Sequence, residues 1–337
     1  MNHLPFVSIV IPTFNRKDTL LECLESLKHQ TYPEDKFEII IVDDGSVDGT
    51  SCAVKEYRKY SKVKIIIVSQ KNSGPGLARN LGVTKSTGEI IGFIEDDVIA
   101  DKNWIKNAVT NLVTLNVDGI EGKTLLKDSQ NTLRSFEGGC KIGFLPCNLF
   151  VKKEAFVRVG GYSSKYYDAG KKIYFREDAD FGFKILEGSY KFIVREDVIV
   201  YHPLQFPAVK DYYRHVKRYY FDPLLHKEHP ESYRDMIEVK NLGRITVHRP
   251  FHYSVVINIL SWIIVVVGLF PKQNLWLYLG ILMLLLTHSI IRYRYEKSLV
   301  PPVWKLQKTV AFLGLPFYYL KWFISGCYKF KNWKCLI

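Results

Sequence analysis

The chain has 337 residues, enough for one large domain with an appendage or for two domains. Its formal net charge of +13 favours a phosphate-bearing ligand, a nucleic acid or an anionic membrane surface as a partner. Most of the basic excess follows Ala208, beside long apolar segments, and no zinc-finger, helix-turn-helix or RNP-like pattern accompanies it. These features argue against nucleic acid and favour a membrane surface.

The six cysteines are scattered, with neither a Cys-x-x-Cys pair nor a histidine at zinc-binding spacing. We therefore expect reduced, mostly buried thiols in a cytoplasmic protein. Residues 1–6 lack the charged start and the long apolar run of a signal peptide, so we expect the first domain to remain in the cytoplasm.

Strands and helices are predicted to alternate in the first half of the chain. Apolar, β-branched runs predict the strands, and helically spaced apolar residues predict the helices between them. The predicted strands are 7–11, 37–42, 63–68 and 90–94, and the predicted helices are one with Asp18 as its N-cap, followed by 50–60, 74–85 and 103–116. Continuous apolar runs indicate a mostly parallel sheet, so the predicted fold class is α/β.

Three of these strands end in polar residues: Pro12-Thr13-Phe14-Asn15, Asp43-Asp44-Gly45-Ser46 and Glu95-Asp96-Asp97. The carboxyl ends of strands in an open α/β sheet border the crevice where ligands bind. Asp-Gly-Ser is also ordinary turn chemistry, and three acids in a row also fit an acidic turn before a helix. The repetition favours binding, with Asp44 accepting hydrogen bonds from a nucleobase or ribose and the acids at 95–97 holding a divalent cation.

The segment from Asn72 to Asn80 opens a predicted helix with Gly74-Pro75-Gly76. A helix N-terminus favours anions, although the segment is neither a dinucleotide fingerprint nor a Walker A loop. Arg79 is expected either to reach a phosphate or nucleobase or to pair with an acid in the crevice.

Four segments in this order resemble glycosyltransferase family 2. They are Val-Ser-Ile-Val-Ile-Pro-Thr-Phe-Asn-Arg, Val-Asp-Asp-Gly-Ser-Val-Asp-Gly-Thr, Gly-Pro-Gly-Leu-Ala-Arg-Asn-Leu-Gly and Gly-Glu-Ile-Ile-Gly-Phe-Ile-Glu-Asp-Asp. The resemblance extends from about Val7 to His202 and implies a GT-A fold that transfers a sugar, with inversion, from a nucleotide diphosphate.

The resemblance also implies which residues bind the donor. Asp97 is the favoured direct ligand of a Mn²⁺ or Mg²⁺ ion. Glu95 stands where the family pattern usually begins with Asp, so the sharing of roles between Glu95 and Asp97 stays open. The other residues expected on the donor side are Pro12, Asn15, Asp43, Asp44, Arg79 and Asp96.

The acceptor half of the resemblance contains Gly160-Gly161-Tyr162 and the acidic stretch Glu177-Asp178-Ala179-Asp180. An inverting transfer requires the acceptor hydroxyl to lose its proton as it attacks, so a carboxylate base is expected. Asp178 is the expected base, and Glu177 and Asp180 are the alternatives; the same acids would also complement a helix dipole. His202, at the end of a predicted strand 198–202, is either a further metal ligand or a structural residue.

The segment 208–250 interleaves aromatic and basic residues, as in a helix at a membrane interface. It is also similar to an arginine-rich family segment, which implies that Arg214 and Arg218 contact the donor diphosphate. A solvated basic face is the alternative.

Residues 253–270 and 275–291 are apolar runs without an internal acid, lysine or arginine, each about long enough to cross a bilayer. Basic flanks at Arg249 and Arg292 place both outer ends in the cytoplasm. A buried helical hairpin is the alternative. Residues 310–328, interrupted by Pro316 and Lys321, are expected to lie on the cytoplasmic leaflet, and a third span is the alternative.

Three regions are therefore expected: a GT-A catalytic domain at 1–207, an interfacial segment at 208–250 and a membrane region at 251–337. The expected activity is metal-assisted transfer from a UDP-, GDP- or dTDP-linked sugar to a lipid-linked or cell-envelope glycan at the cytoplasmic face of the cell membrane. A processive polysaccharide synthase and a catalytically silent scaffold are the alternatives. Two spans are too few for an export channel, no Gln-x-x-Arg-Trp segment is present, and the intact acids argue against a scaffold.

Overall fold

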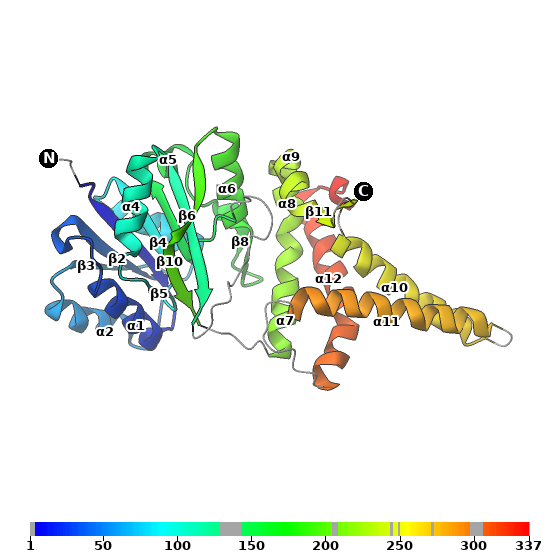
Figure 1. Cartoon of the computed structure of the whole chain (residues 1–337). Coiled ribbons are helices and arrows are strands. Elements are labelled where there is room, and N and C mark those ends of the chain that lie inside the picture. Colours follow the sequence, from blue (N-terminus) through cyan, green and yellow to red (C-terminus); the bar gives the residue numbers. More distant parts are fainter. Residues whose placement is uncertain are drawn as a thin grey trace. The chain divides into compact units, whose positions relative to one another are not determined.

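The structure, a computed structural model, describes residues 4–127, 143–203, 208–242, 245–248, 250–270, 273–296 and 306–336. It contains two compact units, Met1–Leu204 and Gln205–Ile337 (Figure 1).

The first unit is built on an eight-stranded sheet with the strand order β3-β2-β1-β4-β7-β6-β10-β5. Strand β1 pairs in parallel with β2 and β4, as do β2 with β3 and β6 with β10, whereas β7 and β5 run antiparallel to their neighbours. The predicted mostly parallel α/β fold is confirmed. The strands are Val7–Thr13 (β1), Phe37–Asp43 (β2), Lys64–Ser69 (β3), Ile90–Ile94 (β4), Ile99–Ala100 (β5), Gly119–Leu126 (β6), Asn148–Lys152 (β7) and Phe192–His202 (β10).

Helices cover both faces of this sheet (Figure 1). One face packs against α1 (Lys17–Lys28), α2 (Thr50–Tyr57) and α4 (Trp104–Thr114), and the other against α3 (Pro75–Lys85), α5 (Lys153–Arg158) and α6 (Glu177–Glu187). In β1, Ile9 and Ile11 belong to the first core and Val10 to the second. Burial on both faces explains why the strands are continuous apolar runs.

Two short features complete the first unit. A small hairpin is formed by β8 (Tyr167–Asp168) and β9 (Ile173–Tyr174). Helix α1 begins at Lys17 with Arg16 as its N-cap, so the prediction of Asp18 as the N-cap was wrong. Asp18 lies in the first turn instead, where its charge complements the helix dipole.

The pairing of β10 with β6 changes register between Arg195 and Ile199. Asn148 of β7 bridges this irregularity, because its Nδ2 donates to the carbonyl oxygens of Lys123 at 3.1 Å and Val198 at 3.0 Å. Strands β4, β6 and β10 run in the same direction. The carboxyl end of β10 therefore lies at the same edge of the sheet as the carboxyl end of β4.

The second unit is mainly helical. Its elements are α7 (Val209–Lys217), α8 (Asp222–Glu228), α9 (Pro230–Tyr233), β11 (Val239–Leu242), β12 (Ile245–His248), α10 (Pro250–Gly268), α11 (Asn274–Glu296) and α12 (Leu306–Phe330). Its core lies between α7 and α12, where Tyr212 and Tyr219 are buried. These two aromatic side chains, predicted at a membrane interface, are therefore core residues.

Helix α12 continues through Pro316, which lies in its interior. Proline removes one helical hydrogen bond, at a cost of about 3 kcal/mol in an isolated helix. Leu315, Tyr319, Phe323 and Cys327 recur every fourth residue and are all buried in the core. This packing stripe offsets the loss at the proline.

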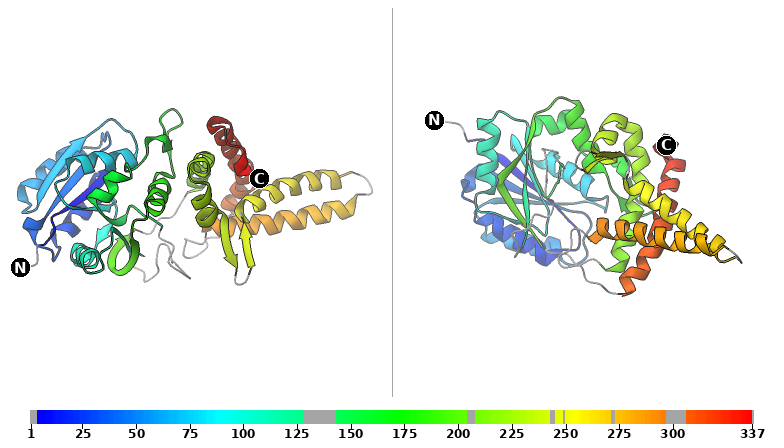
Figure 2. Two further views of the ribbon diagram at one scale, coloured as in Figure 1. Left: turned by 90° about the horizontal axis from the view of Figure 1, so that it is seen from above. Right: turned by 45° about the vertical axis from the view of Figure 1, so that its right-hand side comes forward.

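Helices α10 and α11 form an antiparallel hairpin and lie side by side (Figure 2). Asn258 Nδ2 donates to Thr287 Oγ1 at 2.8 Å between the two helices. Among the described residues, no helix has both the length and the apolar character needed to cross a membrane. The predicted membrane spans at 253–270 and 275–291, and the third span considered at 310–328, are therefore not supported.

Candidate active site

The acids Glu95, Asp96 and Asp97 follow β4 in a turn at the centre of the sheet. Asp96 is buried, and Arg16 Nη1 lies 3.0 Å from Asp96 Oδ1 and 2.7 Å from Asp97 Oδ2. Burial raises the pKa of Asp96 to about 6, although Arg16 opposes this shift. The turn therefore concentrates more negative charge than Arg16 alone neutralises.

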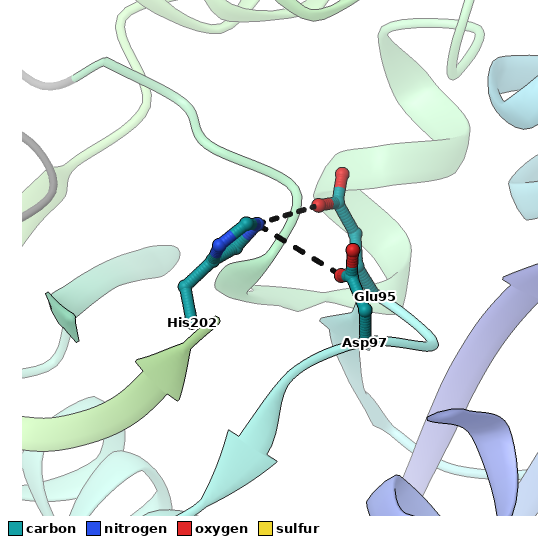
Figure 3. Close-up of side chains that lie close together, drawn as sticks. All are labelled: Glu95, Asp97 and His202. Carbon is teal, nitrogen blue, oxygen red and sulfur yellow. Dashed lines mark ion pairs between the residues drawn. The ribbon is translucent and has the colours of Figure 1, made fainter. Parts of the chain in front are cut away.

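Glu95, Asp97 and His202 converge from the ends of β4 and β10 (Figure 3). The Nε2 atom of His202 lies 3.8 Å from Asp97 Oδ1 and 4.0 Å from Glu95 Oε2. One ligand atom from each residue lies within 4.8 Å of the other two. The structure thus brings together the three residues that the sequence proposed as metal ligands.

The hydrogen bonds around this group leave several acceptor atoms facing one another. His202 Nδ1 lies 2.9 Å from the carbonyl oxygen of Pro203, which only accepts, so Nδ1 carries a proton. In the neutral ring the lone pair of Nε2 then faces two carboxylates, and the buried Asp97 Oδ1 has no hydrogen-bond partner among the described residues. A cation between the three acceptors would satisfy all of them. Carboxylate oxygen and imidazole nitrogen suit Mn²⁺, and Mg²⁺ prefers oxygen, so this group fits a divalent cation.

Asp44 holds the loop after β3 against the end of β2. Its Oδ1 accepts hydrogen bonds from Gln70 Nε2 at 2.7 Å and Ser73 N at 2.8 Å, and its Oδ2 accepts one from Gly74 N at 2.9 Å. Pro12 is buried within the neighbouring strand β1. A contact of either residue with a nucleobase stays a prediction.

Asp43 and Asn15 shape the loops at this edge. Asp43 accepts from Ser46 N at 2.8 Å and from Ser51 Oγ at 2.6 Å, which is the turn chemistry that the sequence left open. Asn15, with a φ of 53°, donates its N–H to Ser46 Oγ at 2.9 Å and accepts from Val47 N at 2.8 Å. The loops after β1 and β2 are thus tied together, and donor contacts by both residues stay predictions.

Arg79 is buried in α3, and its Nη2 lies 3.3 Å from Glu95 Oε1. The guanidinium carbon lies 5.6 Å from the centre of the Tyr162 ring, and Nε has no hydrogen-bond partner within the part of the chain that the structure describes. Of the two expectations for Arg79, the structure shows the pairing with an acid. A contact with phosphate stays a prediction.

The candidate bases lie in the first turn of α6, after Arg176, which has a φ of 75°. Asp178 Oδ1 accepts from Ala179 N at 2.8 Å. Asp180 is fully buried, and its carboxylate pairs with Lys184 Nζ at 2.6 Å. The structure therefore favours Asp178 over Asp180 for contact with an acceptor.

The start of α6 lies beside the start of α3. A Cβ atom at Gly76 would lie 3.0 Å from Glu177 Cγ and 3.3 Å from Tyr162 Cβ. Burial raises the pKa of Tyr162, and the charges of Asp178, Glu177 and Glu95 raise it further. The charges of the candidate base and of Glu95 thus both act on one buried tyrosine.

Arg214 and Arg218 belong to the second unit. Arg214 lies on α7, where its Nη2 pairs with Asp211 Oδ1 at 3.3 Å. Arg218 begins the 3-10 turn that follows α7. A contact of either arginine with a donor diphosphate stays a prediction.

Sequence reasoning missed two residues of this site, Arg16 and Tyr162. Arg16 directly follows a polar strand end, so the position of the strand end was the signal that could have identified it. Tyr162 follows Gly160 and Gly161, both with positive φ. The sequence marked this turn as part of the family resemblance but gave Tyr162 no role in the site. The contacts of both side chains depend on loop conformations that residue patterns do not reveal.

Residues 8–180, just over half of the chain, match the family described as glycosyl transferase family 2. The chain belongs to glycosyltransferase family 2 and is a glycosyltransferase enzyme.

Two relatives illustrate this membership. Glycosyltransferase AglE of Haloferax volcanii is 27% identical over 281 residues, which cover 80% of this chain and 83% of AglE. A poly(ribitol-phosphate) beta-glucosyltransferase of Bacillus spizizenii is 36% identical over 129 residues, which cover 36% of this chain and 20% of that protein. The second likeness thus spans about a fifth of the relative's length.

Solved structures share the GT-A-like fold. The mannosyltransferase PcManGT from Pyrobaculum calidifontis, in complex with GDP-Man and Mn²⁺, has a TM-score of 0.59 at 17% identity, with 99% of this chain and 88% of that chain covered. TarS 1-349 of S. aureus, in complex with UDP-GlcNAc, has a TM-score of 0.54 at 17% identity, with 97% and 92% covered.

Proposed function

We propose that this enzyme transfers a sugar from a nucleoside-diphosphate donor to an acceptor hydroxyl in a single, inverting displacement. The observation that carries the proposal is the convergence of Glu95, Asp97 and His202 at the ends of β4 and β10. The charge of Asp178, in the first turn of α6, acts on the same buried Tyr162 as that of Glu95. Relatives of known structure bind UDP-GlcNAc and GDP-Man, which supports a nucleotide-sugar donor here.

Asp178 is the proposed base of this reaction. It accepts the proton of the acceptor hydroxyl while the acceptor oxygen forms its bond to the anomeric carbon of the donor sugar. The bond between that carbon and the diphosphate oxygen breaks on the opposite face, and a nucleoside diphosphate leaves. The hydrogen bond from Ala179 N to Asp178 Oδ1 orients the carboxylate for this step.

The acidic turn is proposed to hold the donor diphosphate. Glu95, Asp97 and His202 would hold a divalent cation, which supplies charge neutralisation for the leaving diphosphate when it is bound. Arg79, paired with Glu95 at 3.3 Å, keeps that carboxylate at the edge of the crevice.

The proposed acceptor is a lipid-linked or cell-envelope glycan at the cytoplasmic face of the cell membrane. Two features support this location: the basic excess after Ala208 and the apolar side chains exposed on α10 and α11. A processive synthase and a silent scaffold compete with this proposal, and the carboxylates of the site argue against the scaffold.

The activity is tested by incubating the purified enzyme with membrane lipid extract and labelled UDP-, GDP- or dTDP-sugars. Parallel reactions contain Mn²⁺ or EDTA. We expect Asp178→Asn to lower the transfer rate by about 10²- to 10⁴-fold, the usual share of a general base, without weakening donor binding measured by calorimetry. Glu187→Gln, at the exposed end of the same helix, is the matched control and should retain the wild-type rate.

Two outcomes would contradict the proposal. If Asp178→Asn retained nearly full transfer, Asp178 would not be the base, and an acceptor phosphate that is already ionised would be favoured. If folded wild-type protein neither hydrolysed nor transferred any sugar of the panel, the scaffold would be favoured.

A further inference from the structure

Arg16 contacts the acidic turn, and it meets Asp97 through the carboxylate oxygen other than the one that faces His202. Its Nη1 contacts Asp96 Oδ1 at 3.0 Å and Asp97 Oδ2 at 2.7 Å. The side chains of these two acids are only 6% and 8% exposed, whereas that of Arg16 is 48% exposed. Arg16 therefore brings a positive charge from the solvent side onto two nearly buried carboxylates.

The loop that carries Arg16 is fixed at several points. Asn15 is bonded to Ser46 and Val47, and Lys17 N donates to Asp48 Oδ2 at 3.0 Å. These hydrogen bonds hold the backbone on both sides of Arg16, so its side chain extends from a fixed backbone. Within the part of the chain that the structure describes, the hydrogen bonds of the Arg16 side chain go to Asp96 and Asp97.

Asp97 is shared between Arg16 and the candidate cation site. Its Oδ2 contacts Arg16. Its Oδ1 is buried, has no hydrogen-bond partner in the described segments and faces His202 Nε2 at 3.8 Å. A guanidinium on one oxygen of a carboxylate and a divalent cation on the other oxygen are close enough to repel each other. The same guanidinium attracts a diphosphate, for which arginine is a preferred ligand.

We propose that Arg16 is a positioning residue that couples the divalent cation to the nucleotide diphosphate. Without nucleotide, Arg16 neutralises Asp96 and Asp97 and opposes binding of the cation. With nucleotide, Arg16 contacts the diphosphate, and its repulsion of the cation is offset. This inference rests on the proposed function, because it requires that the site bind both partners.

The test measures binding rather than turnover. Mn²⁺ alone is titrated by electron paramagnetic resonance, and UDP and GDP are titrated by calorimetry in saturating Mn²⁺. Loss of the positive charge in Arg16→Gln removes a repulsion of Mn²⁺ and an attraction of the diphosphate. We therefore expect this variant to tighten Mn²⁺ binding about tenfold and to weaken nucleotide binding at least about tenfold. Arg16→Lys should keep Mn²⁺ binding close to wild type, since it keeps the charge, and should weaken nucleotide binding because it loses the planar fork.

Lys17→Gln is the matched control, because it removes the same charge one residue away. The Lys17 side chain is 41% exposed and lies 3.8 Å from Asp18, not against the acidic turn. It should leave both affinities unchanged, and circular dichroism should show all variants folded.

The outcomes separate this inference from the proposed function. If wild-type protein binds neither Mn²⁺ nor either nucleotide, the proposed function itself fails. If wild type binds both and Arg16→Gln weakens both, Arg16 is a structural support for the acids and the inference is overturned. Unchanged affinities in Arg16→Gln overturn it equally.

Discussion

At the scale of single residues, Glu95 and Asp97 differ in their surroundings although both face His202. Glu95 is 35% exposed in its side chain and is paired with Arg79. The side chain of Asp97 is 8% exposed, and no described residue donates a hydrogen bond to its Oδ1. A cation therefore gains more from Asp97, whose oxygen lacks another partner, than from Glu95. This asymmetry favours Asp97 over Glu95 as the direct ligand of the cation, a choice that the sequence left open.

Substitution of each acid by its amide tests this asymmetry. We expect Asp97→Asn to weaken Mn²⁺ binding by at least about thirtyfold and Glu95→Gln by about three- to tenfold, because carboxylate charge dominates binding of hard cations. Electron paramagnetic resonance titration measures both affinities. Asp35→Asn, in the exposed turn before β2, is the control. A larger loss in Glu95→Gln than in Asp97→Asn would reverse the assignment.

Residue patterns predicted the acids of the site but not their partners. Glu95 and Asp97 were predictable because polar residues at strand ends meet at one edge of a parallel sheet. The contacts of Arg16 and Asp44 were not predictable, because they depend on loops with residues such as Asn15 in positive φ. Such conformations are set by hydrogen bonds between segments far apart in the sequence.

At the scale of elements, strands made of continuous apolar runs were predicted. Strands that mix apolar with polar or charged residues were missed wholly or in part. Strands β1, β2, β3 and β4 are short apolar runs, which periodicity identifies. Only residues 198–202 of β10 were predicted, since charged residues at 195–197 coincide with its register change against β6. Strands β6 and β7 were missed, because Gly, Glu, Lys and Asn interrupt their apolar pattern.

Glu38 links several of these elements from within β2, although its side chain is fully buried. Its Oε1 accepts from Ser8 Oγ at 2.8 Å and from Thr87 N and Oγ1 at 2.8 and 2.7 Å, and its Oε2 lies 2.8 Å from Lys64 Nζ. Burial alone would raise the pKa of Glu38, but the bonds from Lys64, Thr87 and Ser8 together lower it below 4.5. The carboxylate thus ties β1, β3 and the segment before β4 together.

A lowered pKa in the folded state means that ionised Glu38 stabilises the fold above pH 4.5 and that this contribution is lost as the pH falls below that value. We expect Glu38→Gln to lower the free energy of opening of β1 and β2 by about 2 kcal/mol at pH 7, since charge-assisted bonds are lost. The difference from wild type should shrink at pH 3. Hydrogen exchange followed by mass spectrometry measures it, with exposed Glu34→Gln as the control. An equal difference at both pH values would contradict the argument.

At the scale of the whole molecule, the two units distribute polarity differently. In the first unit apolar side chains form two cores around the sheet. In the hairpin of α10 and α11, polar Asn258, Ser261 and Thr287 are buried between the helices, whereas many large apolar side chains are exposed. Exposed apolar area of this extent indicates an interaction surface. Helices that pack through small and polar residues and expose apolar ones are typical of a lipid environment.

The proposed location at a membrane predicts that the full chain floats with liposomes containing anionic lipid in a density gradient. Leu282, Leu285 and Leu286 of α11 are 64%, 62% and 62% exposed, so their replacement by aspartate should leave the hairpin folded. We expect the triple variant to reduce the bound fraction at least about tenfold, because each buried leucine contributes about 2 kcal/mol to transfer from water. The control replaces Val47, Val113 and Val157 of the first unit, which are 90%, 58% and 60% exposed, and should float like wild type. If wild-type protein stays at the bottom of the gradient and instead self-associates with rising concentration, a second copy covers the hairpin and the membrane location is wrong.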